Sequence, residues 1–175
     1  MSQNNKHLHP LKFVPVAAKR PWGQHRLAQD WNKPFDPKET LGESWEISGF
    51  ADDSSIVAEG YLAENALYDI IETYMGDIVG EDLYKFFGNE FPLLIKLLDV
   101  QEKLSLQVHP DDETAFDRHD SYGKTEAWYV LHAEPGAKIY MGFNRDMDPN
   151  EFYQRCKEGR VLDVLNVVEP KAGDF

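Results

Sequence analysis

The stretch LSLQVHP, residues 104–110, carries the pattern on which both the predicted fold and the predicted site depend. Its apolar residues alternate with polar ones, as in a β-strand that buries only one face. Ser105, Gln107 and His109 therefore share the polar face. An ordinary solvated face would explain this alternation, since antiparallel sheets commonly have one wet side. Glutamine and histidine two residues apart could also coordinate one metal ion, which favours a strand that lines a cavity.

Strand-like segments flank this stretch on both sides. The four clearest are ESWEISGF, FPLLIKLLDV, TEAWYVLHA and AKIYMGFN, at residues 43–50, 91–100, 125–133 and 137–144. The second is almost continuously apolar, which predicts a buried strand. Apolar spacings of three and four predict a small helical insertion at about residues 65–90. A capped helix is predicted over residues 148–159, with Asp148 at the N-cap and Pro149 at N1. Because strands do not alternate with helices, we predict a mainly β fold, an antiparallel sandwich or barrel.

The composition limits the class of protein and its partners. The 175 residues suffice for one compact domain, so we predict a single domain over residues 1–175. The net charge of −13 argues against nucleic acid as a partner. No run of about 18 apolar residues occurs, so no membrane span is predicted, and the N-terminus lacks the apolar core of a signal peptide. The lone Cys156 excludes an internal disulfide, and together these features predict a cytoplasmic protein whose oligomeric state is left open.

A metal site needs ligands from more than one segment. Glu126 lies in residues 125–133, and if this segment pairs with the strand that carries His109, the two side chains can share an ion. His132 and Glu126 cannot bind the same metal ion from one straight strand, because their positions are six residues apart and are therefore separated by roughly 20 Å. Ligands of one metal lie about 2 Å from it, so we expect side-chain atoms of His109 and Glu126 within about 5 Å of each other.

Four motifs, in this order, resemble the type I mannose-6-phosphate isomerases, or phosphomannose isomerases, of the cupin superfamily. They are GESWEIS, FPLLIKLLDV, LSLQVHPDDETA and GKTEAWYVL, and together they span residues 42–131. RPWG near the start and GAKIYMGF after the last motif extend the resemblance over most of the chain. The resemblance implies a cupin-type antiparallel β-barrel, or jelly roll, and the interconversion of mannose 6-phosphate and fructose 6-phosphate.

The resemblance also implies a cofactor and a set of site residues. The metal would be zinc, with one ion per chain. Three of its ligands would be Gln107, His109 and Glu126. Lys96 and Ser105 match positions that bind the substrate, towards its phosphate. Lys124 matches a further lysine of the pocket and is a candidate catalytic residue.

The chain departs from the family pattern at its end. Members of the family continue past a segment like KAGDF, residues 171–175, into a strand with a further histidine ligand, and a catalytic arginine follows. No histidine follows His132 in this sequence. We therefore expect a truncated chain, with that ligand and the arginine beyond Phe175. If the site is complete within these residues, His25 and His119 are the first alternatives.

An aldose–ketose isomerase moves a proton between C1 and C2 of the sugar, usually through an enediolate. A divalent cation stabilises the charge that develops on the two oxygens. An acidic protein must supply local cations for the phosphate, and Lys96 and Lys124 are the candidates. The base could be Lys124 or a metal-bound water. Two other hypotheses stay open: a non-catalytic cupin module that binds a sugar phosphate, and a cupin metal oxygenase, which Gln107 disfavours because such sites use two histidines and one carboxylate.

Overall fold

A computed structural model describes residues 8–50 and 53–175 of the chain. The chain divides into two compact units, Met1–Leu104 and Ser105–Phe175. The single cupin-like domain over residues 1–175 stays a prediction. Part of the N-terminal stretch on which the absence of a signal peptide rests lies outside the described residues. Within the described ranges, no helix is both long enough and apolar enough to cross a lipid bilayer.

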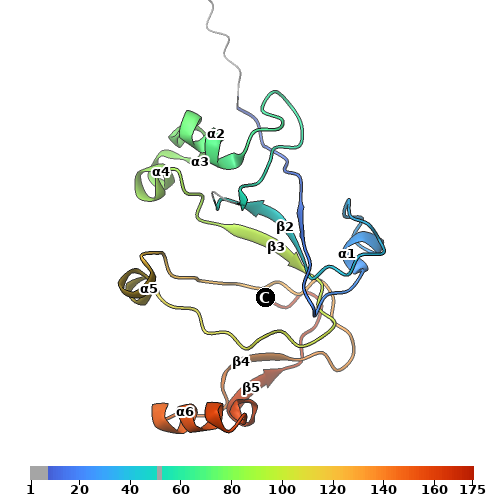
Figure 1. Ribbon diagram of the computed structural model, residues 1–175, viewed down its shortest axis with the longest axis vertical. Coiled ribbons are helices and arrows are strands. Elements are labelled where there is room, and N and C mark those ends of the chain that lie inside the picture. Colours follow the sequence, from blue (N-terminus) through green and yellow to red (C-terminus); the bar gives the residue numbers. More distant parts are fainter. Residues whose placement is uncertain (1–7, 51–52) are drawn as a thin grey trace, which may run out of the picture. The chain divides into compact units, whose positions relative to one another are not determined.

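The first unit is built on a three-stranded antiparallel sheet (Figure 1). Its strands are β1 (Val16–Ala18), β2 (Glu43–Ser48) and β3 (Leu94–Leu98), in the order β1-β2-β3. The register places Trp45 of β2 opposite Lys96 of β3, and an irregularity follows between Trp45 and Ile47. Because β3 lies at an edge of this sheet, it is not covered on all sides. The strand predicted within residues 91–100 is confirmed at Leu94–Leu98, but its predicted burial is wrong, because Ile95 is exposed.

Helices predicted at about residues 65–90 are confirmed. The helices of this unit are α1 (Arg26–Gln29), α2 (Leu67–Tyr74), α3 (Gly76–Val79) and α4 (Glu81–Phe87). The chain bends between α2 and α3 at Met75, whose φ of 50° lies in the left-handed region that few residues other than glycine adopt. Helix α2 buries three apolar side chains. Of these, Ile70 packs with Val57 and Leu62 in the core of the unit.

The second unit contains a two-stranded antiparallel sheet and two longer helices (Figure 1). Its elements are α5 (Asp112–His119), β4 (Ile139–Phe143), α6 (Pro149–Lys157), the 3₁₀ helix η2 (Val161–Val164) and β5 (Leu165–Val168). Strands β4 and β5 pair with each other. Helix α6 is capped as predicted, because the Asp148 side chain accepts hydrogen bonds from the backbone N–H groups of Asn150 and Glu151. Pro149 occupies its first turn.

The two segments expected to carry the metal ligands do not form β-strands. No strand is assigned to residues 104–110 or 125–133 in the part of the chain that the structure describes. A backbone hydrogen bond from Lys124 N, just before the second segment, to Pro110 O, at the end of the first, holds the chain together beside α5. A strand requires a continuous partner backbone for its N–H and C=O groups. Side-chain alternation does not supply that partner, so the prediction of strands at these two places is wrong.

The predicted fold class is confirmed only in its antiparallel pairing and in the helices between residues 65 and 90. Helices outnumber strands in the described ranges, so these residues are not mainly β. A closed barrel gives every strand two neighbours, whereas sheets of three and two strands leave edges. The cupin-type barrel therefore stays a prediction.

Candidate functional site

A close approach of two chain segments in the second unit brings His109 and Glu126 together. After His109 the chain enters α5, and it then returns through Gly123 to Glu126. The Gly123 N–H donates to Asp112 Oδ1 at 2.9 Å. A Cβ at Gly123 would lie 2.6 Å from the carbonyl carbon of Asp111, so glycine is needed at this approach. As a result, His109 Nε2 lies 3.5 Å from Glu126 Oε2, within the predicted limit of about 5 Å.

Both carboxylate oxygens of Glu126 have partners. The Trp128 indole N–H donates to Oε1 at 2.5 Å, and Lys124 Nζ lies 3.2 Å from Oε2, the oxygen that faces His109. Partial burial is the largest single influence on the pKa of Glu126 and acts to raise it. Hydrogen bonds from Trp128 and Lys124, and then the electrostatic influence of Lys124 and His109, outweigh burial, so this pKa lies below its ordinary value. The carboxylate is therefore ionised at neutral pH, the form that binds a cation.

Ser105 and Gln107 lie together on an exposed stretch of chain. Gln107 Nε2 donates to Ser105 Oγ at 2.9 Å, and the amide oxygen of Gln107 is then the atom that could ligate a cation. The apolar residues between the polar ones are exposed as well, and Val108 is 86% exposed. The expectation that the apolar residues of this stretch face a packed side is therefore wrong, because no covering layer lies over Val108 in the described chain.

The donor atoms of the second unit suit a zinc ion in chemistry and in spacing. Imidazole nitrogen and carboxylate oxygen are common zinc ligands, and two ligands of a tetrahedral site lie roughly 3.3–3.5 Å apart. The 3.5 Å between His109 Nε2 and Glu126 Oε2 agrees with that separation. Among the described residues, no group of three His, Cys, Asp or Glu side chains is placed to hold a metal. A third ligand from this part of the chain would therefore be an amide, such as that of Gln107.

Lys96, the residue predicted to bind phosphate, lies in the first unit beside the buried Glu43. The Glu43 carboxylate accepts a hydrogen bond from the Trp45 indole N–H at 2.7 Å. It also pairs with Arg20 Nη2 at 3.1 Å and with Lys96 Nζ at 3.5 Å. Burial is the largest influence on the pKa of Glu43 and acts to raise it, but the hydrogen bond from Trp45 and the two cations together hold this pKa below its ordinary value.

Sequence patterns did not reveal this cluster. Glu43 and Glu46 are three apart on a strand and so face opposite sides, which predicts that at least one of them is plain surface. This prediction is wrong, since Glu43 is buried and the Glu46 side chain, which accepts a hydrogen bond from Ser44 and pairs with Lys33 at 2.5 Å, is only 27% exposed. The available signal was an acidic residue at the start of a strand that also carries tryptophan, together with a lone lysine in an apolar run.

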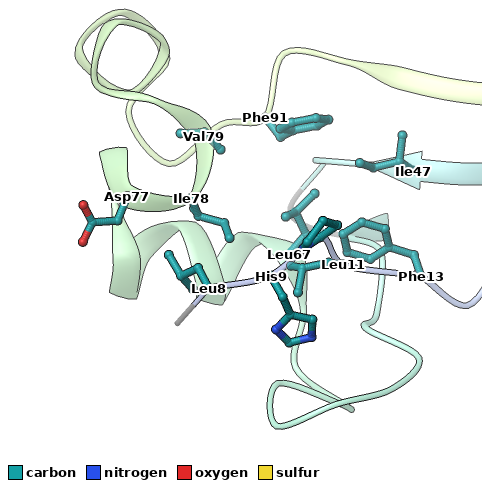
Figure 2. A pocket seen from close by; sticks show the side chains of 11 residues that line it. Leu8, His9, Leu11, Phe13, Ile47, Leu67, Asp77, Ile78, Val79 and Phe91 are labelled. Carbon is teal, nitrogen blue, oxygen red and sulfur yellow. The ribbon is translucent and has the colours of Figure 1, made fainter. Parts of the chain in front are cut away.

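A largely apolar cavity of about 360 Å³ lies elsewhere in the first unit (Figure 2). Its apolar lining includes Leu8, Leu11, Phe13, Ile47, Leu67, Ile78, Val79 and Phe91. Figure 2 shows the carboxylate of Asp77 turned away from these apolar side chains. None of the predicted site residues belongs to the lining, so this cavity provides no argument about the chemistry of the protein.

Comparison with known proteins gives consistent matches. Residues 11–134 match the family described as phosphomannose isomerase type I, catalytic domain. A protein of Bacillus subtilis (strain 168) named "Probable mannose-6-phosphate isomerase GmuF" is 36% identical over 172 residues, which cover 95% of this chain and 51% of that protein. The mannose-6-phosphate isomerase of Streptococcus mutans is 35% identical over 170 residues, which cover 95% of this chain and 50% of that protein.

Solved structures give the same result. The crystal structure of the mannose 6-phosphate isomerase from Bacillus subtilis matches with a TM-score of 0.82 and 30% identity, and covers 95% of this chain and 51% of that one. The chain thus spans about half the length of the curated relatives it matches. The family match over residues 11–134 contains every predicted site residue. The chain belongs to the type I phosphomannose isomerase family.

Proposed function

We propose that the product of this gene is a zinc-dependent mannose-6-phosphate isomerase and that this chain carries three of its metal ligands. The reaction interconverts mannose 6-phosphate and fructose 6-phosphate through an enediolate. The observation that carries the proposal is the 3.5 Å approach of His109 Nε2 to the ionised Glu126 carboxylate. These two residues stand in the two motifs that most resemble the family, and relatives named as mannose-6-phosphate isomerases support the choice of substrate.

The proposed zinc ligands are Gln107, His109 and Glu126. A bound zinc ion would supply positive charge beside the sugar oxygens on which negative charge develops. The chain itself would hold the ligand atoms in position. Trp128 fixes one oxygen of Glu126 by its hydrogen bond, and the glycine at position 123 permits the approach of the two segments.

Lys96 and Ser105 are proposed to bind the phosphate of the substrate. A phosphate monoester carries about two negative charges at neutral pH. Since the chain as a whole has a net charge of −13, attraction for phosphate must come from cations in particular places. Lys96 is such a cation, and the Ser105 hydroxyl is a neutral donor on the exposed stretch that also carries Gln107.

Lys124 is proposed to act on the proton that moves between C1 and C2. Its Nζ lies 3.2 Å from Glu126 Oε2, and its side chain is partly exposed, so it is next to the proposed ligands and open to a substrate. A lysine at this place could accept the proton as the amine, or donate hydrogen bonds to the enediolate oxygens as the ammonium ion.

The wider features of the protein follow from the same proposal. The family match and the likeness to the Bacillus subtilis structure support a cupin-type jelly-roll barrel. A sugar phosphate is the proposed small-molecule partner, and a cytoplasmic location suits an enzyme that acts on one.

The test measures zinc and isomerisation in the same preparations. The gene product is stripped with a chelator and reloaded with zinc, and fructose 6-phosphate formed from mannose 6-phosphate is then measured. We expect the gene product to bind one zinc ion per chain, to lose activity on stripping and to regain it on reloading. Sugar-phosphate binding without turnover in any metal state would favour a non-catalytic module instead.

A pair of histidine variants tests the metal ligands. His109→Asn should lose zinc and activity together. His132→Asn is the matched control, because His132 is also a partly exposed histidine paired with a glutamate, Glu134, at 2.9 Å. It should keep both properties. Equal loss in the two variants, or zinc retained in full by His109→Asn, would refute the role of His109.

A further inference from the structure

Two cations of the first unit share one buried carboxylate. Arg20 Nη2 lies 3.1 Å from Glu43 Oε2, and Lys96 Nζ lies 3.5 Å from Glu43 Oε1. The side chain of Glu43 is 7% exposed, that of Lys96 is 24% exposed and that of Arg20 is 40% exposed. The carboxylate is therefore buried, and each of its oxygens faces the cation of a side chain that is partly exposed.

The position of Arg20 is fixed by packing as well as by charge. A Cβ at Gly42 would lie 2.5 Å from Arg20 Cβ and 2.8 Å from Arg20 Cγ, so the side-chain stem of Arg20 occupies the space that glycine leaves. Arg20 Nη1 also donates to the Lys19 carbonyl at 3.3 Å. The guanidinium has five N–H donors, and these contacts with Glu43 and Lys19 use two of them. Further donors are thus available on a head group that is already held in place.

The cluster has more positive than negative charge. One carboxylate faces two cations, which leaves a surplus of one positive charge in a chain whose net charge is −13. Three other lysines of this unit are each paired with one glutamate. These pairs are Lys12–Glu59, Lys19–Glu39 and Lys33–Glu46. The surplus at Glu43 therefore marks a place where an additional anion is attracted rather than repelled.

We propose that Arg20 is a second phosphate-binding cation, which acts with Lys96 on the phosphate of the sugar while Glu43 holds both head groups in place. The inference rests on the proposed function, because it takes the phosphate role of Lys96 from there. The ligand is a phosphate monoester dianion. Arginine suits this ligand, because its planar fork can donate two parallel hydrogen bonds to phosphate oxygens, and the shared carboxylate reduces the freedom that both side chains lose on binding.

The experiment measures equilibrium binding of inorganic phosphate and of mannose 6-phosphate to the complete gene product. Variants are Arg20→Ala, Arg20→Lys, Lys96→Ala and, as the control, Lys19→Ala, which removes the neighbouring cation that pairs with Glu39. Because Arg20→Ala removes a charge-assisted hydrogen bond, we expect it to lower the affinity for both ligands about 10-fold or more. The affinity of Arg20→Lys should lie between those of Arg20→Ala and the wild type. Lys19→Ala should change binding by less than about 2-fold.

The outcomes separate this inference from the proposed function. Weaker binding in Lys96→Ala with unchanged binding in Arg20→Ala would overturn the role of Arg20 and leave that of Lys96 intact. Unchanged binding in both would overturn the phosphate role of Lys96, and with it the site. Thermal unfolding is measured for every variant. If Arg20→Ala does not fold, Arg20→Gln is measured instead, because glutamine keeps a hydrogen-bond donor for Glu43 and removes the charge. Wild-type affinity in Arg20→Gln would overturn the proposal, and an affinity about 10-fold lower would support it.

Discussion

Replacing Trp128 by phenylalanine isolates one hydrogen bond of the proposed metal site. The Trp128 indole N–H donates to Glu126 Oε1, while Oε2 of the same carboxylate faces His109 and Lys124. Trp128→Phe removes the donor and keeps an aromatic ring on a side chain that is 42% exposed. We therefore expect this substitution to change the free energy of zinc binding more than it changes the free energy of unfolding.

Two effects should weaken zinc binding in this variant. The carboxylate of Glu126 loses a partner that orients it, and the loss of such partners typically reduces metal affinity by about 10- to 100-fold. The hydrogen bond from Trp128 is also the largest of the influences that lower the pKa of Glu126, so its removal raises that pKa. Protons then compete better with the metal. The ratio of variant to wild-type dissociation constants should therefore be larger near pH 5 than near pH 7.

The assay is competition for zinc with a chromophoric chelator at several pH values. Trp31→Phe is the matched control, because Trp31 is 40% exposed and lies in the first unit, away from the proposed ligands in the sequence. We expect a loss of about 10- to 100-fold for Trp128→Phe and less than about 2-fold for Trp31→Phe. Equal zinc affinity of Trp128→Phe and wild type at every pH would refute the idea that this hydrogen bond prepares Glu126 for a metal.

Substitutions at three further positions test other features. Glu43→Ala leaves two cations without their buried partner and should lower the free energy of unfolding, measured in urea, by about 3 kcal/mol. This value is at the low end of the range for breaking a buried ion pair, because the side chains of both cations are partly exposed. The folded pKa of Glu43 lies below its unfolded value of about 4.3, so this stabilisation is present above that pH and is lost as the pH falls through the folded pKa; a wild-type advantage that grew on acidification would contradict the assignment. Gly42→Ala should cost about 1–3 kcal/mol in thermal unfolding, because the new methyl group collides with Arg20. Asp148→Ala should cost about 1 kcal/mol through loss of the α6 cap, and Asp148→Asn should retain most of that stability.

Features set by a few neighbouring residues were predictable from the sequence. The cap of α6 needs only Asp148 and the two N–H groups that follow in the first turn. The helices between residues 65 and 90 follow from apolar spacing, and Gly88 ends α4 with a φ of 60° that suits glycine. Such signals act over one or two turns of chain, so tertiary structure does not need to be known.

Features that depend on distant parts of the chain were predicted less well. Alternation in residues 104–110 predicted a strand with one packed face, yet Val108 is 86% exposed, because alternation does not determine which backbone pairs with the segment. The Glu43 cluster depends on the register that sets Trp45 opposite Lys96, which no local pattern encodes. The approach of His109 to Glu126 was predicted from their expected place as ligands of one metal on two paired strands. The contact is present although neither segment is a strand, because it joins two side chains.

The surplus charge around Glu43 has a kinetic consequence for a dianion in solution. At long range the dianion meets a chain of net charge −13 and is repelled, and only within a few ångströms does it meet Arg20 and Lys96. The screening length falls from about 30 Å at 0.01 M salt to about 8 Å at 0.15 M, so added salt removes the distant repulsion before it weakens the nearby attraction. The association rate constant of the sugar phosphate should therefore increase over this range of salt, the reverse of the decrease seen when a ligand is steered by opposite charge. Physiological salt would then speed the encounter of this acidic chain with the proposed sugar-phosphate ligand.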